Sequence, residues 1–359
     1  MLIVRSPVRI SFAGGGTDLP SYYERYGGAV LSTAINKYFY TTLCRRHDGR
    51  IQVISSDLRI FESWRDIASM DIRGSGLEIP LAVLKELGSD LSIDLFLSSE
   101  IPPGTGLGSS ASVCVNILKT ITTYLGCPLS KYDLAERAFH IARNVLERHV
   151  GRQDEFAAAF GGFNFITFHS DGLTEVRPVE IDSELLHELQ AHLMLFFTGS
   201  AHHSWTILQE QEKSTANQTG AAIEALHNVR ALADRMLDAL RSGNLSLFGS
   251  LLDEGWKAKK RISGRISNPR IDHLYDVALR NGALGGKITG AGGGGFLLLY
   301  CEPENQEAVR SALEAEGIRE MAFAFDKNGA QVIVNDPFID GDERSGSRWI
   351  FTPLSALGR

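Results

Sequence analysis

The chain has 359 residues, more than one compact core usually holds, and this length suits two domains of ordinary size. Its apolar fraction of 43% and charged fraction of 22% are those of a folded globular protein. A formal net charge of -7 provides no broad basic face for a phosphate backbone, which argues against nucleic acid as a partner.

The cysteines and the hydropathy pattern indicate the compartment. No apolar run reaches the ~18 residues of a membrane span, and Arg5 and Arg9 interrupt the N-terminal stretch. No Cys-x-x-Cys pair is present, so neither a zinc site nor a disulfide framework is indicated. The four cysteines lie far apart, at Cys44, Cys114, Cys127 and Cys301. We therefore expect a cytoplasmic protein without a signal peptide or membrane contact.

The first half of the chain predicts strands separated by glycine-rich or polar breaks, at Leu2–Phe12, Tyr38–Cys44, Ile51–Ser55, Leu91–Leu97 and Gly162–Phe168. Two amphipathic helices are expected between the last two strands, at Ser109–Leu125 and Tyr132–Arg148. This half thus mixes sheet and helix.

The pattern changes near residue 190, where we place a boundary between domains 1–190 and 191–359. Two strands are expected beyond it, at Leu193–Thr198 and Phe296–Tyr300. Helices are expected at Ala221–Arg241, Leu245–Lys260, Ile271–Arg280 and Glu304–Glu316. The second half is therefore also α+β, and the polar segment Asp340–Ser347 is expected to be a loop.

A glycine-rich loop, Pro102–Ala111, lies between a predicted strand and a predicted helix. Backbone N–H groups and the positive end of a helix can hold an anion there, which suits a nucleotide triphosphate. The loop lacks the Gly-Lys-Ser/Thr ending of a Walker P-loop. A tight turn with Ser109 as the helix N-cap is the alternative.

A second glycine run, Gly290–Gly295, fits the dinucleotide spacing Gly-x-Gly-x-x-Gly. We expect it to follow a helix and enter a strand, the reverse of the dinucleotide-binding context, so that match is a false positive. Glycines at this density indicate close contact with a ligand or with another backbone segment. A packed glycine turn remains the alternative.

A third segment, Arg9–Asp18, is a strand that ends in three glycines and carries one carboxylate. An aspartate after glycines is usually part of a turn. The three segments in this order resemble the motifs of the GHMP kinases, a family named for galacto-, homoserine, mevalonate and phosphomevalonate kinases. The resemblance covers nearly the whole chain.

The resemblance implies a two-domain GHMP-kinase fold of the α+β class, with a ribosomal-S5-like N-terminal domain and a ferredoxin-like C-terminal domain around the active site. It implies an ATP-dependent transferase with Mg²⁺ as cofactor and a sugar or sugar phosphate as acceptor. The sequence is also compatible with a homo-oligomer.

Four segments look like one branch of this family, the D-glycero-D-manno-heptose 7-phosphate kinases: Ala13–Asp18, Ile35–Tyr38, Gly151–Asp154 and Ala158–Phe163. The branch phosphorylates the anomeric hydroxyl of heptose 7-phosphate and feeds nucleotide-heptose synthesis for surface polysaccharide. Kinases for other sugars such as fucose share parts of the pattern. A catalytically silent sugar- and nucleotide-sensing protein is a second alternative.

The resemblance also implies residue roles. Asp154 aligns with the catalytic aspartate and Arg9 with the arginine beside it; a helix cap and a strand-surface arginine are the alternatives. Implied substrate-binding residues are Gly15, Gly16, Thr17, Asp18 and Lys37, with Arg25 as a further candidate for a sugar phosphate. Implied ATP-binding residues are Pro103, Gly104, Thr105, Gly106, Leu107, Gly108, Ser109, Ser110, Gly290 and Gly292. Lys287 and Thr289 either contact phosphate or flank the turn.

Ser110 is the implied hydroxyl ligand of Mg²⁺. The second ligand in relatives is a glutamate on the helix ahead of the aspartate, and the alignment puts Ala142 there. Glu147, about one turn later, is the substitute we consider, with an exposed surface glutamate as the alternative. His202 and His203 stand where an arginine-bearing segment is expected and could meet a substrate phosphate or lie at the surface.

Overall fold

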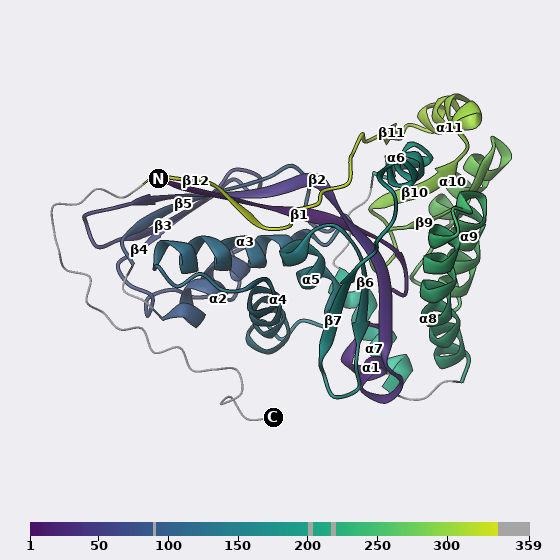
Figure 1. The fold of residues 1–359 in the computed structure, drawn as a ribbon. Helices are drawn as coiled ribbons and strands as arrows, with labels where there is room; N and C mark the ends of the chain where they lie inside the picture. The colour runs from purple at the N-terminus through teal and green to yellow at the C-terminus, as the bar shows by residue number, and fades with distance from the viewer. Residues whose placement is uncertain (89–90, 200–203, 217–219, 337–359) are drawn as a thin grey trace.

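The computed structural model describes residues 1–88, 91–199, 204–216 and 220–336 (Figure 1). The strands are β1 (Leu2–Ala13), β2 (Gly28–Arg45), β3 (Ile51–Ser55), β4 (Ile60–Trp64), β5 (Ile93–Ser99), β6 (Phe163–Phe168), β7 (Thr174–Pro178), β8 (Leu193–Phe197), β9 (Ala283–Ile288), β10 (Phe296–Cys301), β11 (Arg319–Glu320) and β12 (Gln331–Asn335).

The helices are α1 (Pro20–Tyr26), α2 (Glu78–Leu87), α3 (Ser109–Tyr124), α4 (Lys131–His140), α5 (Gln153–Phe160), α6 (Ser183–Ala191), α7 (Ser204–Ala216), α8 (Gly220–Arg241), α9 (Leu245–Lys260), α10 (Pro269–Arg280) and α11 (Pro303–Ala315). A π-helical turn, η1 (Ile141–Val145), extends α4. No helix in the described part of the chain is long and apolar enough to cross a membrane.

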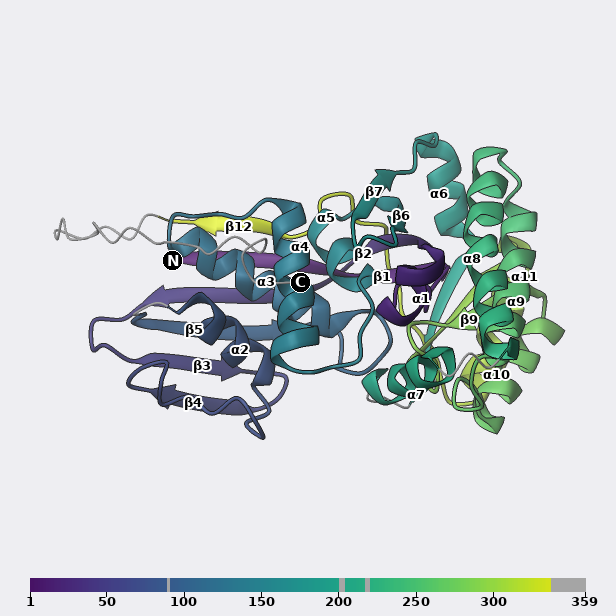
Figure 2. The ribbon, with the colours of Figure 1, turned by 90° about the horizontal axis from the view of Figure 1, so that it is seen from below.

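The first sheet runs in the order β12-β1-β2-β5-β3-β4 (Figure 2). The long strand β2 holds it together, because its first part pairs with β6 and its second part with β5, while β1 lies along both. Helices α2, α3, α4 and α5 lie on one side of this sheet (Figure 1). Apolar residues of β1, β2, β3 and β5 form a core with these helices.

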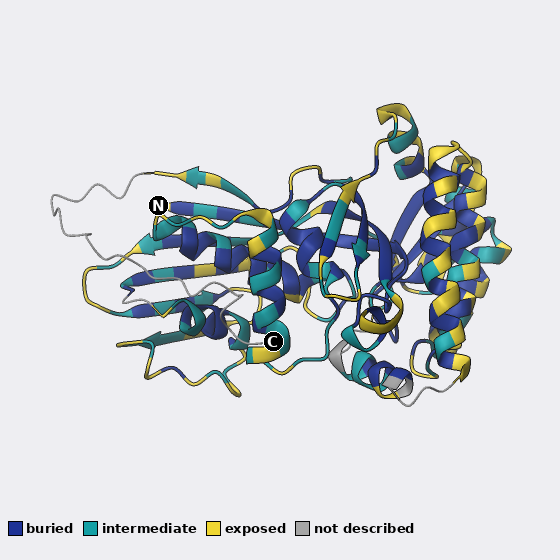
Figure 3. Ribbon diagram, turned by 60° about the horizontal axis from the view of Figure 1, so that its bottom comes forward, coloured by how far each residue is buried: buried dark blue, intermediate teal, exposed yellow. Residues whose placement is uncertain are grey.

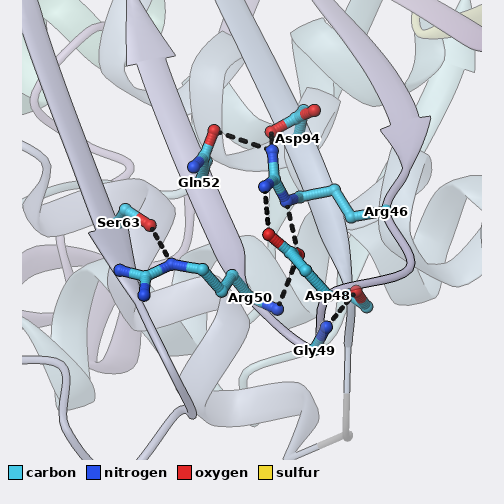
Figure 4. A network of polar contacts seen from close by, with 8 residues as sticks. Arg46, Asp48, Gly49, Arg50, Gln52, Ser63 and Asp94 are labelled. Atoms are coloured by element: carbon cyan, nitrogen blue, oxygen red, sulfur yellow. Dashed lines mark hydrogen bonds and ion pairs between the residues drawn. The ribbon is translucent and has the colours of Figure 1, made fainter.

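A polar network fixes the outer end of this sheet, where β2 turns into β3 (Figure 4). The Arg46 guanidinium donates to Asp94 on β5 at 2.8 Å and to Gln52 on β3 at 2.9 Å. It also pairs with Asp48 in the turn. One side chain thus joins the turn after β2 to the two neighbouring strands β3 and β5.

The second sheet has the order β11-β8-β10-β9 and is antiparallel. Its central strand β10 is buried along its whole length, because alternate side chains point to opposite faces and both faces are covered. Phe296, Leu298 and Tyr300 belong to one apolar core, whereas Leu297 and Leu299 belong to another. Helices α8 and α9 bury one face each and expose the other (Figure 3).

Most long elements match the sequence prediction, with differences at their ends. The helix expected to reach Arg148 leaves α-helical geometry at Ile141, in η1. The expectation that Gly290–Gly295 follows a helix is wrong, since this run joins the two paired strands β9 and β10. Strand β12 returns to pair with β1, and the domain boundary near residue 190 stays a prediction.

Candidate active site

A cavity of about 410 Å³ lies where the three glycine-bearing segments meet. It brings together residues that are distant in sequence, from β1, from the loop before α3, from the start of α5 and from the turn after β9. The predicted site residues that line it are Arg9, Gly15, Gly16, Asp18, Pro103, Gly104, Gly106, Gly108, Ser109, Ser110, Asp154 and Gly290.

The two glycine runs pack against each other, backbone to backbone. A Cβ atom on Gly106 would lie 2.4 Å from the carbonyl oxygen of Thr289, and one on Gly290 would lie 2.6 Å from the Cα of Gly106. A Cβ on Gly295 would lie 2.2 Å from the oxygen of Thr105. Only glycine allows this approach, so backbone packing accounts for much of the glycine density.

The loop before α3 presents free backbone donors to the cavity. Gly108 occupies the N-cap position of α3 with a φ of 76°, and no side chain caps the helix. Ser109 is the first helical residue, so the alternative in which it serves as the N-cap is wrong. The N–H groups of the first turn and the helix dipole are left for an anion, and the exposed Ser110 lines the cavity beside them.

Arg9 on β1 and Asp154 in the first turn of α5 form an ion pair at the wall of the cavity. The guanidinium NH2 lies 2.6 Å from Asp154 Oδ1, and Nε donates to the same oxygen at 2.8 Å. Its NH1 donates to the carbonyl of Gly106 at 2.8 Å. Arg9 therefore ties the carboxylate to the phosphate loop and supplies a fixed positive charge.

Asp18 ties the first motif to α5. Its Oδ1 accepts from the backbone N–H of Gly16 at 2.8 Å, and its Oδ2 accepts from the N–H of Gln153 at 3.3 Å. Burial and the nearby Asp154 carboxylate raise the pKa of Asp18 above its ordinary value. The side chain both orders the turn and presents acceptor oxygens at the cavity.

Two buried lysine side chains also lie at the cavity. Lys259, near the end of α9, donates to the carbonyl of Gly290, and burial lowers its pKa to about 8. Lys287 on β9 donates to the carbonyls of Ser11 and Phe12 at 2.8 and 3.1 Å, and burial lowers its pKa well below the ordinary value. Both line the cavity. The sequence predicted that Lys287 either contacts phosphate or flanks the turn. It did not indicate Lys259, because the last turn of α9 contains three lysines that look alike in sequence.

Several predicted residues do not line the cavity. Thr17 is buried, and its hydroxyl donates to the carbonyls of Gly14 and Ala29, which makes it a turn residue. Lys37 lies where the β1–β2 register shifts, and Arg25 lies exposed on α1. The side chains of Thr105 and Leu107 are buried in the loop, and Gly292 packs against Ile266. The histidines 202 and 203 lie outside the described residues, as does the segment 340–347.

The glutamate expected to bind metal is also elsewhere. The Glu147 side chain is 75% exposed and faces the exposed Arg73 at 3.5 Å, outside the cavity lining. Ala142 does line the cavity but brings no ligand atom. Glu155, which the sequence analysis did not single out, lines the cavity and is buried.

This arrangement has the parts of a small-molecule kinase, because an uncapped helix N-terminus for phosphates and a carboxylate held by an arginine lie side by side in the lining of one cavity. Residues 78–162 match the N-terminal domain of the GHMP kinases and residues 236–319 match the C-terminal domain. The chain belongs to the GHMP kinase family, as the sequence motifs predicted, and is a phosphotransferase.

Similar proteins support this assignment over more than nine tenths of the chain. A D-glycero-alpha-D-manno-heptose 7-phosphate kinase of Campylobacter jejuni is 32% identical over 91% of this chain and 97% of its own. A crystal structure of a D-glycero-D-manno-heptose 1-phosphate kinase from Bacteroides thetaiotaomicron is 30% identical, with a TM-score of 0.79 over 94% of this chain and 100% of that one. The chain also matches 35% of a fucokinase/fucose-1-phosphate guanylyltransferase of Bacteroides fragilis, with 26% identity over 85% of this chain.

Proposed function

We propose that this protein is a sugar kinase that transfers the γ-phosphoryl group of ATP to the anomeric hydroxyl of D-glycero-D-manno-heptose 7-phosphate. The product would be the 1,7-bisphosphate, a precursor of nucleotide-activated heptose for surface polysaccharide. The observation that carries the proposal is the Arg9–Asp154 pair, which lies directly against the phosphate loop in the wall of one cavity. Similarity to a heptose 7-phosphate kinase supports the choice of acceptor.

The residues of the cavity divide the work of an in-line transfer between positioning and charge neutralisation. The first turn of α3 binds the triphosphate through its free N–H groups. Asp154 accepts the proton of the acceptor hydroxyl or orients it, and Arg9 offsets the developing negative charge. Asp18 accepts hydrogen bonds from sugar hydroxyls, which donate at fixed spacing.

The cavity also fits a magnesium ion accompanying ATP. Among the described residues no cluster of three metal-ligating side chains exists, but Mg²⁺ bound with a nucleotide needs only one or two protein oxygens besides the phosphates. The exposed Ser110 hydroxyl provides one such oxygen at the phosphate loop. When bound, the ion neutralises charge on the phosphates.

The names of the similar proteins suggest more than one sugar acceptor. Relatives of similar identity are named for heptose 7-phosphate and heptose 1-phosphate, and a more distant one for fucose. Each name implies a different position for the free hydroxyl or the existing phosphate. A kinase for another sugar, such as fucose, therefore remains the second candidate.

A coupled assay for ADP release tests the acceptor directly. Heptose 7-phosphate, heptose 1-phosphate, unphosphorylated heptose and fucose are compared at equal concentration, and phosphorus NMR locates the new phosphate. We expect the highest kcat/KM with heptose 7-phosphate and a new signal at the anomeric position. A preference for another member of the panel would replace the acceptor, and binding without turnover of any member would favour the silent sensing protein.

A further inference from the structure

Glu155 is a buried carboxylate with one oxygen that lacks a hydrogen-bond partner among the described residues. It follows Asp154 in the first turn of α5, lines the cavity and is only 2% exposed. Its Oε2 has no hydrogen-bond partner in the described part of the chain. An ionised carboxylate that is removed from water without a partner is costly, so such groups are normally paired or bound to a metal.

The charges around Glu155 do not neutralise it. Burial raises the pKa of Glu155 well above its ordinary value, and the like charges of Asp154 and Asp18 raise it further. Arg9 is held by Asp154 and by the Gly106 carbonyl. Three carboxylates therefore line the cavity, and Arg9 is already paired with one of them.

The two buried lysines are committed as well. Lys259 donates to the carbonyl of Gly290, and Lys287 donates to the carbonyls of Ser11 and Phe12. Neither makes an ion pair with Glu155. No cationic side chain among the described residues is therefore free to neutralise Glu155, and a cation bound together with the nucleotide could do so.

A second oxygen ligand lies on the adjacent helix. Helices α3 and α5 pack together, and Ser110 in the first turn of α3 lines the same cavity. Cys114, one helical turn after Ser110, also lines this cavity, so the face of α3 that carries Ser110 borders the space that Glu155 lines. Ala142 has no ligand atom and Glu147 lies outside the cavity, so neither competes for this role.

We propose that Glu155 is the carboxylate ligand of the magnesium ion that accompanies ATP, with the Ser110 hydroxyl as the second protein ligand. This inference rests on the proposed kinase function. A hard divalent cation prefers oxygen ligands and keeps several waters, so one carboxylate, one hydroxyl and the phosphate oxygens complete a site of ordinary composition. The metal would provide the countercharge that the protein itself does not supply.

Binding of Mn²⁺, followed by electron paramagnetic resonance in the presence of a non-hydrolysable ATP analogue, tests the inference without any acceptor. We expect Glu155→Gln to weaken Mn²⁺ binding at least 10-fold and Ser110→Ala to weaken it less. Gln has the shape of a protonated glutamate, so the variant should fold, and its melting temperature is measured alongside.

Glu78→Gln is the matched control, because Glu78 also lines the cavity but is paired with Arg148 at 2.5 Å. Its Mn²⁺ affinity should equal that of the wild type. Equal affinity in Glu155→Gln, or no Mn²⁺ binding by the wild type with the analogue, would overturn the inference. Since no sugar is present, an incorrect acceptor would leave the result unchanged and would show only in the turnover panel.

Discussion

Arg9 holds Asp154 by one oxygen only. Both guanidinium contacts, from NH2 at 2.6 Å and from Nε at 2.8 Å, go to Oδ1. Among the described residues nothing hydrogen-bonds Oδ2, the oxygen that faces Gly108 of the phosphate loop. One oxygen thus fixes the carboxylate, and the other is left for the acceptor hydroxyl.

Replacing Asp154 with Asn should lower kcat by ~10²-fold or more, because an amide cannot accept the hydroxyl proton. ATP affinity should stay near the wild-type value, since the phosphates bind to the loop and the helix N-terminus. Initial rates and calorimetric titration with an ATP analogue measure the two quantities. Turnover close to that of the wild type would exclude Asp154 as the base.

Replacing Asp18 with Asn should raise the acceptor KM by ~10-fold or more, since a charged acceptor of hydrogen bonds is lost. It should also lower the melting temperature, because the Gly16 and Gln153 N–H groups each donate to a different carboxylate oxygen. The amide oxygen of Asn can accept from only one of them, and its NH2 group leaves the other without an acceptor. Asp57→Asn is the control, as Asp57 lines the same cavity from the turn after β3 and is exposed. An unchanged KM in Asp18→Asn would confine that residue to the turn.

Gly106→Ala tests the contact between the glycine runs. Gly106 has a φ of 80°, and its added Cβ would lie 2.4 Å from the Thr289 carbonyl oxygen. Gly126 has a similar φ of 73° with nothing within 4 Å, so Gly126→Ala carries the backbone strain alone. We expect Gly126→Ala to cost the ~1–2 kcal/mol of a left-handed residue and Gly106→Ala to cost more, as measured by urea unfolding. An equal loss of unfolding free energy in the two variants would show that the Thr289 segment moves away from the added methyl group at little cost.

The sequence predicted the part of the site that local glycine spacing identifies, namely the phosphate loop. Glycines spaced two apart between a strand and a helix indicated the Pro102–Ala111 loop, and this loop does precede α3. Asp154 could be found only through the family resemblance, because an aspartate near a helix start is common. The cavity lining now places Asp154 beside that loop.

Other parts could not be predicted, because their roles arise from long-range packing. Lys259 and Glu155 occur within ordinary helical patterns, and only the fold removes them from water. Strand β12 pairs with β1 across more than 300 residues, which no local pattern encodes. Lys37 was expected to bind the substrate, but it does not line the cavity. It lies in the part of β2 where the pairing register with β1 shifts, which the sequence did not predict.

Lys259 should make ATP binding and stability depend on pH in the alkaline range. Its pKa falls from 10.5 to about 8, chiefly through burial and then through Arg9, with Asp18 and Asp154 opposing the change. Between these two values the unfolded chain holds a proton that the folded chain has lost, so this group makes the free energy of unfolding rise with pH across the window.

The same proton loss should weaken the binding of a triphosphate, because the neutral amine no longer attracts it. We therefore expect the KM for ATP to increase above about pH 8 in the wild type, and this increase should disappear in Lys259→Met. Lys257→Met is the control, since Lys257 is exposed on the same helix and paired with Asp253 at 2.6 Å. Initial rates from pH 6.5 to 9.5 measure the dependence. A KM that rises equally in the wild type and in Lys259→Met would assign the effect to another group, such as the buried Lys287. The pKa of Lys287 is itself lowered by burial and by the nearby positive charges of Lys259 and Arg9.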